Sequence, residues 1–387
     1  MKNLKIVLAS LIVVSSLYAD EILNDTQKSI LDKKQTKAEK EAGITKDSWI
    51  NPLSIELKDQ KTKAANNNSE IESKSASIVF DQEIFGSISK TIQKGNIELK
   101  LNTTLVDQEK KALLSRLYGY VIDLKKIDLQ IEQLYYQISS KKIEIKKNED
   151  SYIGGIIDIT VLDESVIELS TLKNQRDDLN LQKLDILRDF KNYSNSDYKT
   201  IDLSFLNSFD LQKYLSENKN IKVKELEYKR SGIDKDIVAN NYLPKLSVYG
   251  SYGYEDGDSY AKSDDSYYYG LKLSMPLDFN SGKNKEVSKL NKLISKENLY
   301  QTKLEEKSFY SYAIKKLKHI DNKIINTDQT IKRYKSLHEN VKSLYENSLK
   351  TIDDVTIMEN RMASSRLDKL IFECEKKSIL NSIFIRM

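Results

Sequence analysis

Residues 242–282 read YLPKLSVYGSYGYEDGDSYAKSDDSYYYGLKLSMPLDFNSG. Their side chains alternate with a period of two on both sides of an acidic, glycine-containing loop, which is typical of a β-hairpin with two different faces. Pro244 and Pro276 bracket the hairpin, at strand ends where a missing N–H is tolerated. The stretch 242–276 is therefore predicted to be a hairpin with one apolar face, formed by Leu246, Val248, Gly250, Tyr252, Tyr254, Tyr269, Leu271, Leu273 and Met275.

A second stretch, 49–82, has the same design. Leu53, Ile55 and Leu57 alternate with polar residues, and after a polar loop Ile78 and Phe80 do the same. This alternation predicts a second two-faced hairpin near the N-terminal end of the chain.

Each predicted hairpin is followed by a long helical tract. In the first tract, Leu117, Leu124, Ile131, Ile138 and Ile145 recur every seven residues, the pattern of a helix in a left-handed coiled coil. The pattern breaks at YIGGIIDIT, 152–160, where two glycines permit a turn, and then resumes in a return helix. A helix of about 60 residues would be roughly 90 Å long, too long for one compact core.

The second half of the chain repeats the first with a constant offset of 193 residues (345 − 152). The offset carries Tyr152 to Tyr345, Ile78 to Leu271 and Leu124 to Leu317. This regularity predicts an internal duplication, with a first repeat over 20–205 and a second over 206–387. Each repeat would contain a helix, a hairpin and a long helical hairpin.

Residues 1–19 are predicted to be a signal peptide. Lys2 and Lys5 precede an apolar run from Ile6 to Val14, and small residues follow up to Ala19. This order is that of an export signal, and the apolar run is too short to span a bilayer. We therefore expect an exported protein.

Composition argues against several classes of function. The chain has 62 basic and 58 acidic residues, so its net charge of +4 is small for 387 residues and does not favour nucleic acid as a partner. One cysteine and two histidines leave little material for a metal centre. Since no nucleophile–base set or phosphate-binding glycine loop is present, we expect neither an enzyme nor a bound cofactor.

The order of hairpin and long heptad helices, given twice after a signal peptide, resembles the TolC-like family of outer-membrane efflux proteins. The segment YENSLKTIDDVTIMENR, 345–361, is similar to that family's turn between paired periplasmic helices. The family pattern is met by Tyr345, Thr351 and Asp354, while Ser348 replaces the usual glycine. In the first repeat the corresponding residues are Tyr152, Gly155 and Asp158.

The resemblance implies an α+β membrane protein whose coiled-coil helical hairpins form a periplasmic α-barrel. Each chain would contribute four strands to a trimeric, 12-stranded outer-membrane β-barrel. The need for several copies also follows from the strands themselves, because four strands cannot close and a bilayer satisfies no open edge. The implied function is the exit duct of a tripartite efflux pump or of type I secretion. The implied partners are outer-membrane lipid, a periplasmic adaptor and an inner-membrane pump or ABC transporter.

The resemblance also implies sites at the helix turns. Tyr345, Lys350 and Asp354 match gate residues of the second repeat, and in the first repeat the acidic partner position falls at Val161. One of three nearby carboxylates would have to replace it: Asp150, Asp158 or Asp163. Gly155 and Ser348 match the surface that docks the adaptor. The alternative is that all of these are solvated residues at two helix turns.

Two other kinds of protein share part of this pattern. A periplasmic coiled-coil adaptor or scaffold would also be exported and rich in heptads, although such adaptors usually have a single coiled hairpin. An adhesin or stalk would not need a strand pair at the same place in each repeat. The sequence does not separate drug efflux from protein secretion, and it names no substrate.

Overall fold

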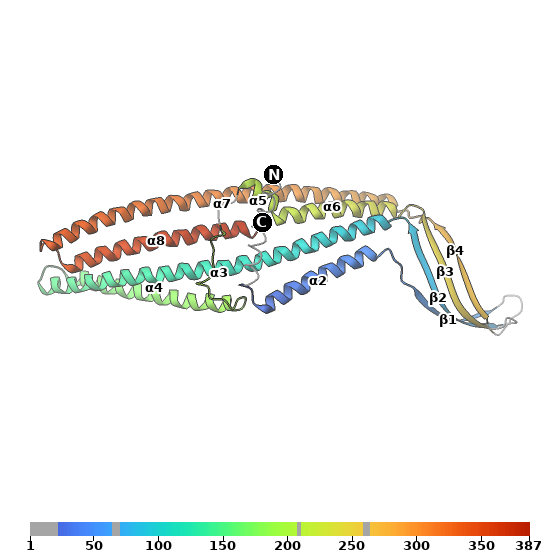
Figure 1. Ribbon diagram of the computed structural model, residues 1–387, viewed down its shortest axis with the longest axis horizontal. Coiled ribbons are helices and arrows are strands. Elements are labelled where there is room, and N and C mark those ends of the chain that lie inside the picture. The colour runs from blue at the N-terminus through green and yellow to red at the C-terminus, as the bar shows by residue number, and fades with distance from the viewer. Residues whose placement is uncertain (1–21, 64–69, 207–209, 258–263) are drawn as a thin grey trace, which may run out of the picture. The chain divides into compact units, whose positions relative to one another are not determined.

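The computed structural model of the protein describes residues 22–63, 70–206, 210–257 and 264–387 (Figure 1). The predicted signal peptide, 1–19, lies outside the described residues. The chain divides into two compact units. Among the described residues, the sheet unit comprises those within 32–106 and 219–304, and the helix unit comprises 22–31 together with those within 107–218 and 305–387. Each unit combines segments from both halves of the sequence.

The sheet unit contains one antiparallel sheet of four strands in the order β1-β2-β3-β4 (Figure 1). The first hairpin joins β1 to β2, the second joins β3 to β4, and β2 pairs with β3 to connect them. The pairing of β2 with β3 shifts register between Glu83 and Phe85, which marks a bulge. The strands are β1 (Ser54–Lys63), β2 (Glu70–Phe85), β3 (Lys245–Gly257) and β4 (Asp264–Ser274).

Helices adjoin the strands within the sheet unit. These are most of α2 (Asp25–Asp47), the start of α3 (Ile88–Ile153), α6 (Lys219–Asn240) and the start of α7 (Ser281–Glu346). Gly95 of α3 lets α2 approach closely, since a Cβ there would lie 2.7 Å from the backbone of Lys46. Ion pairs join α3 to α6 at Lys94–Asp234 (2.9 Å) and at Lys90–Asp236 (3.0 Å).

The helix unit holds the long helical hairpins. The remainder of α3 is followed by α4 (Ile159–Lys191), and the remainder of α7 by α8 (Ile352–Phe384). Both first helices have 66 residues and both return helices have 33, and each helix of the second pair begins 193 residues after its counterpart (281 − 88 and 352 − 159). The predicted duplication is therefore confirmed for the helical hairpins, whereas the repeat boundary at 205/206 stays a prediction.

The core of the helix unit forms where the predicted heptad positions meet other segments. Leu117 and Leu124 of α3 are fully buried, as is Ile383 at the end of α8. They pack with Phe190 and with Tyr214 of the short helix α5 (Leu211–Glu217). The coiled-coil character of α3 is thus confirmed, and its heptad positions bury the apolar stripe.

The same core contains one buried carboxylate. Glu306 is 3% exposed and accepts hydrogen bonds from the Tyr214 hydroxyl and from Asn218 Nδ2, the latter at 2.9 Å. Arg386 completes the charge balance with an ion pair of 2.9 Å. Burial and the carboxylate beside it raise the pKa of Tyr214 well above its usual range.

None of the helices in the described part of the chain has the length and apolar character that a transmembrane helix requires.

Candidate functional site: a two-faced sheet and two paired helix turns

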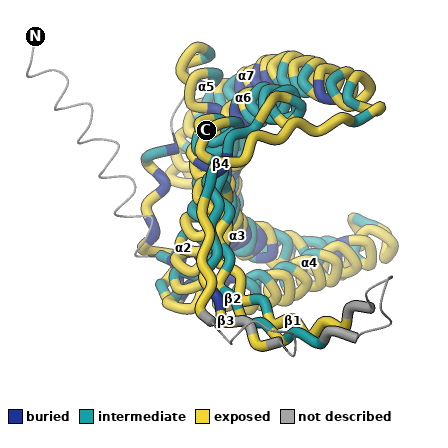
Figure 2. Tube along the Cα trace, turned by 90° about the vertical axis from the view of Figure 1, so that its right-hand side faces the viewer, coloured by how far each residue is buried: buried dark blue, intermediate teal, exposed yellow. Residues whose placement is uncertain are grey.

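The sheet exposes a continuous apolar face. Residues directly opposite each other in an antiparallel pair point to the same side, so the register places Ile55, Ile78 and Tyr252 in one row. Val248 and Leu271 form part of the same face. The large side chains of this face are 37–82% exposed in the single chain: Ile55, Leu57, Ile78, Phe80, Tyr252, Tyr254, Tyr267, Tyr269, Leu271 and Leu273. Figure 2 shows the strands with long exposed stretches. The predicted apolar face is confirmed.

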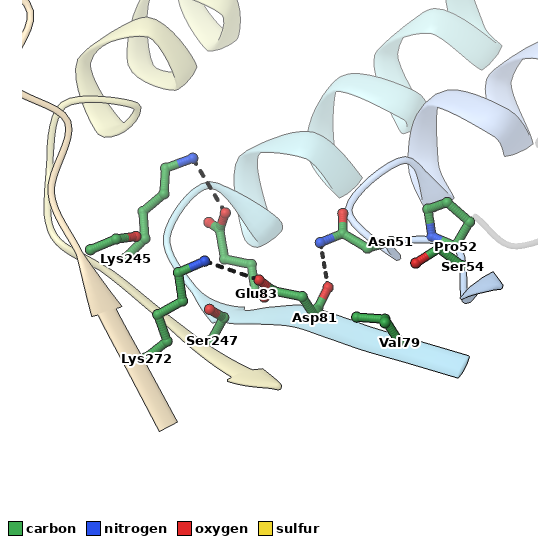
Figure 3. A pocket seen from close by; sticks show the side chains of 10 residues that line it. Asn51, Pro52, Ser54, Val79, Asp81, Glu83, Lys245, Ser247 and Lys272 are labelled. Atoms are coloured by element: carbon green, nitrogen blue, oxygen red, sulfur yellow. Dashed lines mark hydrogen bonds and ion pairs between the residues drawn. The ribbon is translucent and has the colours of Figure 1, made fainter. Parts of the chain in front are cut away.

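The opposite face of the sheet is polar and carries balanced charges. At its base, next to the helices, lies a cavity of about 300 Å³ lined by all four strands and by the segment that enters β1. Glu83 of β2 pairs with Lys245 of β3 at 3.3 Å, and Asp81 of β2 pairs with Lys272 of β4 at 3.2 Å (Figure 3). Asn51 donates from Nδ2 to the Asp81 carbonyl at 2.6 Å. Such a surface is suited to water, whereas the apolar face is suited to hydrocarbon.

Both edges of the sheet have only one partner strand among the described residues. β1 pairs with β2 alone and β4 pairs with β3 alone. An open edge leaves N–H and C=O groups without partners, and a hydrocarbon environment offers no water to satisfy them. In hydrocarbon, the sheet would need further strands along both edges to satisfy these groups.

The two helix turns are built alike. In the first, Ile156 N–H donates to the Ser151 carbonyl at 2.9 Å; in the second, Leu349 N–H donates to the Leu344 carbonyl at 2.8 Å. These bonds belong to the Schellman motif, which requires a left-handed residue just beyond the helix. Gly155 has φ +69° and Ser348 has φ +61°. Ser348 therefore occupies a backbone conformation that favours glycine, which explains the glycine in the family pattern.

The return helices are capped at corresponding positions. The Asp158 carboxylate caps α4 by accepting a 2.9 Å hydrogen bond from Thr160 N–H, and this contact lowers the pKa of Asp158. Thr351 caps α8, where its side chain and that of Asp354 form a reciprocal capping box. Both caps satisfy orphan N–H groups of a helix start.

Asp354 also joins two helices. Its Oδ1 accepts a 2.6 Å hydrogen bond from Lys147 Nζ of α3, while its Oδ2 accepts from Thr351. The Lys147 contact, followed by the Thr351 contacts, holds the pKa of Asp354 at about 2. The other two residues of the predicted gate, Tyr345 and Lys350, are exposed, and the structure does not bring them to Asp354 through a described hydrogen bond or ion pair. Their gate role stays a prediction.

The three candidate carboxylates of the first turn have different surroundings. Asp150 is exposed and its carbonyl accepts from Gly154 N–H at 3.0 Å. Asp158 is the α4 cap, and Asp163 lies in a shallow apolar groove with Ile159 and Val166. The functions predicted for these three residues remain predictions.

Sequence reasoning missed the basic partner of Asp354. It named no basic partner for Asp354, whereas the structure pairs this carboxylate with Lys147, 207 residues away. A heptad pattern shows which face of a helix is buried but does not say which helix it meets. The charged cavity at the base of the sheet was missed as well, although strand alternation already places Asp81 and Lys272 on the polar face.

The helix turns expose apolar side chains. Ile153 and Ile156 at the first turn are 83% and 78% exposed, and Leu349 and Ile352 at the second are also exposed.

Among the residues that the structure describes, no group of three or more His, Cys, Asp or Glu side chains is placed to hold a metal ion.

Comparison with solved structures identifies the fold. The CmeC outer membrane channel of Campylobacter jejuni has 16% sequence identity and a TM-score of 0.72, over 96% of this chain and 85% of that chain. The outer membrane protein VceC of Vibrio cholerae has 10% identity and a TM-score of 0.73, over 95% of both chains. The open state of the MtrE outer membrane channel of Neisseria gonorrhoeae has 11% identity and a TM-score of 0.67, over 95% of this chain and 86% of that chain.

The likeness is one of structure, because no protein-family profile and no curated protein matches the sequence. It covers both hairpins of the sheet and both long helical hairpins. The chain has the fold of the TolC-like outer-membrane channels.

Proposed function

We propose that the protein is an outer-membrane channel, a passive exit duct for substrates that an inner-membrane transporter delivers. The observation that carries the proposal is the four-stranded sheet. It has an exposed apolar face, an ion-paired polar face and two open edges. A surface of this kind is matched by lipid on one side and a water-filled lumen on the other.

The proposed active form is a homotrimer. Three copies of a four-stranded sheet close into a barrel of 12 strands, an even number within the range of bacterial outer-membrane barrels. Closure satisfies both edges of every sheet. Rings of tyrosine suit the interfaces of such a barrel with lipid headgroups, and this chain has 23 tyrosines, several of them on β3 and β4.

The proposed partners at the helix turns are a periplasmic adaptor and, through it, an inner-membrane pump or ABC transporter. Support comes from the small residues Gly155 and Ser348 at corresponding positions and from exposed Ile156 and Leu349 beside them. Gly155 itself is a poor site for a test, since any side chain there strains the backbone. Ile156→Asp combined with Leu349→Asp should abolish export and leave trimers intact. The control Ile44→Asp, at an exposed position far from the turns in sequence, should leave both export and trimers unchanged.

We also propose that the α7–α8 turn narrows the periplasmic end of the duct. Tyr345, Lys350 and Asp354 remain the candidate gate residues, and Lys147 joins them because it holds the start of α8 against α3. In this proposal the duct opens when these contacts break.

Membrane fractionation tests the proposed function against the alternative of a periplasmic adaptor or scaffold. A barrel protein should remain in the outer-membrane fraction after washes with high salt and with alkaline carbonate, and should leave it only in detergent. A scaffold held by charges would be released by the washes. Release by salt or carbonate would overturn the proposal.

A further inference from the structure

The two hairpins of the sheet share one register. In the first hairpin Ile55 lies opposite Ile78, and 193 residues later Val248 lies opposite Leu271. The same offset carries every pair of the first hairpin from Ser54↔Val79 to Thr62↔Ile71 onto a pair of the second, ending at Glu255↔Asp264. The structure therefore repeats the hairpin without a slip of a single residue.

The joint between the hairpins offers a template for the open edges. At this joint, β2 of the first hairpin meets β3, the first strand of the second, and Phe80 lies opposite Gly250. β4 is the duplicate of β2, and β1 is the original of β3. The edge strand β4 of one copy can thus meet β1 of a neighbouring copy in the same way that β2 meets β3.

We propose that the joint between two copies repeats the register of the β2–β3 joint, which places Leu273 of β4 opposite Leu57 in β1 of the neighbouring copy. The register follows from adding the offset to Phe80 and subtracting it from Gly250. It aligns residues 267–274 with residues 56–63 of the neighbour. The inference rests on the proposed barrel and specifies how its subunits join.

This register makes Leu273 and Leu57 the apolar pair of the joint, while Leu271 comes opposite the neighbour's Asp59. On the apolar face Leu273 and Leu57, both largely exposed in the single chain, cover each other. On the polar face Lys272 comes opposite Lys58 of the neighbour. Each lysine is already paired within its own chain, Lys272 with Asp81 at 3.2 Å and Lys58 with Glu56 at 2.6 Å. The like charges are therefore compensated locally.

A shift of the register between the two copies by one residue is excluded, because the apolar and polar faces of their sheets would no longer match. It would place apolar side chains of one copy beside polar side chains of the next, because neighbouring positions point to opposite sides of a sheet. Shifts by two residues keep the faces and are the relevant competitors. They would place Ile55 or Asp59 of the neighbour opposite Leu273.

Disulfide trapping distinguishes these registers. The full-length chain, with its only cysteine removed as Cys374→Ala, would carry Leu273→Cys with a second cysteine at position 55, 57 or 59. Each form would be oxidised in the isolated outer membrane, and covalent dimers and trimers would be measured on non-reducing gels. Ile78→Cys with Tyr252→Cys, which face each other in the template joint, gives the yield of a correctly paired position within one chain.

We expect the pair 57/273 to form interchain disulfides at least about fivefold faster than 55/273 or 59/273. Directly opposite Cα atoms lie roughly 4.5–5.5 Å apart, whereas diagonal neighbours lie about 7–8 Å apart, beyond easy disulfide reach. Highest yield at 55/273 or 59/273 would overturn the register. Trimers that form but do not cross-link at 57/273 would overturn it too and leave the channel proposal standing. A chain that is monomeric and released by carbonate would overturn both.

Discussion

Lys147, near the end of α3, donates a 2.6 Å hydrogen bond to Asp354 in the first turn of α8. The two residues are 207 positions apart and come from the two halves of the duplicated chain. Asp354 also belongs to the capping box of α8. One carboxylate therefore starts a helix and fixes that helix to a neighbour at the same time.

The first prediction follows from the lowered pKa of Asp354. Its carboxyl group has a pKa of about 2 in the folded chain, below the ordinary value near 3.8. The charged form therefore stabilises the fold above about pH 4, and this contribution is lost as the pH falls towards 2. Asp354→Asn should lower the unfolding temperature at pH 7, and the deficit should shrink between pH 4 and pH 2. Asp353→Asn is the control. A deficit that does not change with pH would contradict the assignment.

The second prediction compares the two helix turns. Ser348 has a left-handed backbone that costs a non-glycine residue roughly 1 kcal/mol, so Ser348→Gly should stabilise its turn. Gly155→Ala, at the equivalent position, should destabilise its turn by about the same amount. Hydrogen exchange of peptides covering 343–355 and 150–162 should show slower exchange in the first variant and faster exchange in the second. Effects of the same sign would show that the turns are not equivalent.

The third prediction uses the two faces of β4. Leu273→Arg should impair assembly in the outer membrane, because an arginine on the lipid face costs free energy, from about 1 kcal/mol near the interfaces to roughly 2–4 kcal/mol at mid-bilayer. Ser274→Arg places the same side chain one position away, on the polar face, and should be tolerated. The measurement is the fraction of detergent-extractable trimer in the outer membrane. Equal assembly of the two variants would argue against a lipid-facing surface.

The fourth prediction concerns the buried carboxylate of Glu306. Arg386→Met removes the 2.9 Å ion pair from this buried charge and should destabilise the chain by up to about 3–5 kcal/mol. Adding Glu306→Met removes the buried charge itself and should recover much of that loss. The exposed pair Lys37–Glu41 is the control, and its removal should change the free energy of unfolding by less than about 0.5 kcal/mol. Denaturant unfolding in detergent measures all three, and additive losses in the double variant would contradict the coupling.

Much of the fold follows from sequence periodicity. Strand alternation identified the apolar face of the sheet, and the heptads identified the buried stripe of α3 at Leu117 and Leu124. The 193-residue offset anticipated the equal lengths of the helical hairpins. These features are local or repeated, so one chain contains enough information to predict them.

The missing parts depend on contacts between distant segments. Nothing near Asp354 in the sequence indicates Lys147, and nothing near Glu306 indicates Tyr214 or Arg386. The bulge between Glu83 and Phe85 likewise arises where two hairpins join. The sequence shows that these charged and polar residues are present, but only the folded chain shows which residues they contact.

The central claim is that copies of this chain enclose a water-filled duct through a membrane. Conductance of the purified protein in a planar lipid bilayer tests it most directly. We predict discrete conductance steps. The steps should be larger in Lys147→Ser, which loses the contact with Asp354, and in the Tyr345→Phe, Lys350→Ser double variant, which removes the other two candidate gate residues. Asp354→Ala should weaken cation selectivity, since Asp354 supplies negative charge at the proposed narrow end. Insertion without any conductance, in the wild type and in the loosened variants alike, would contradict the claim.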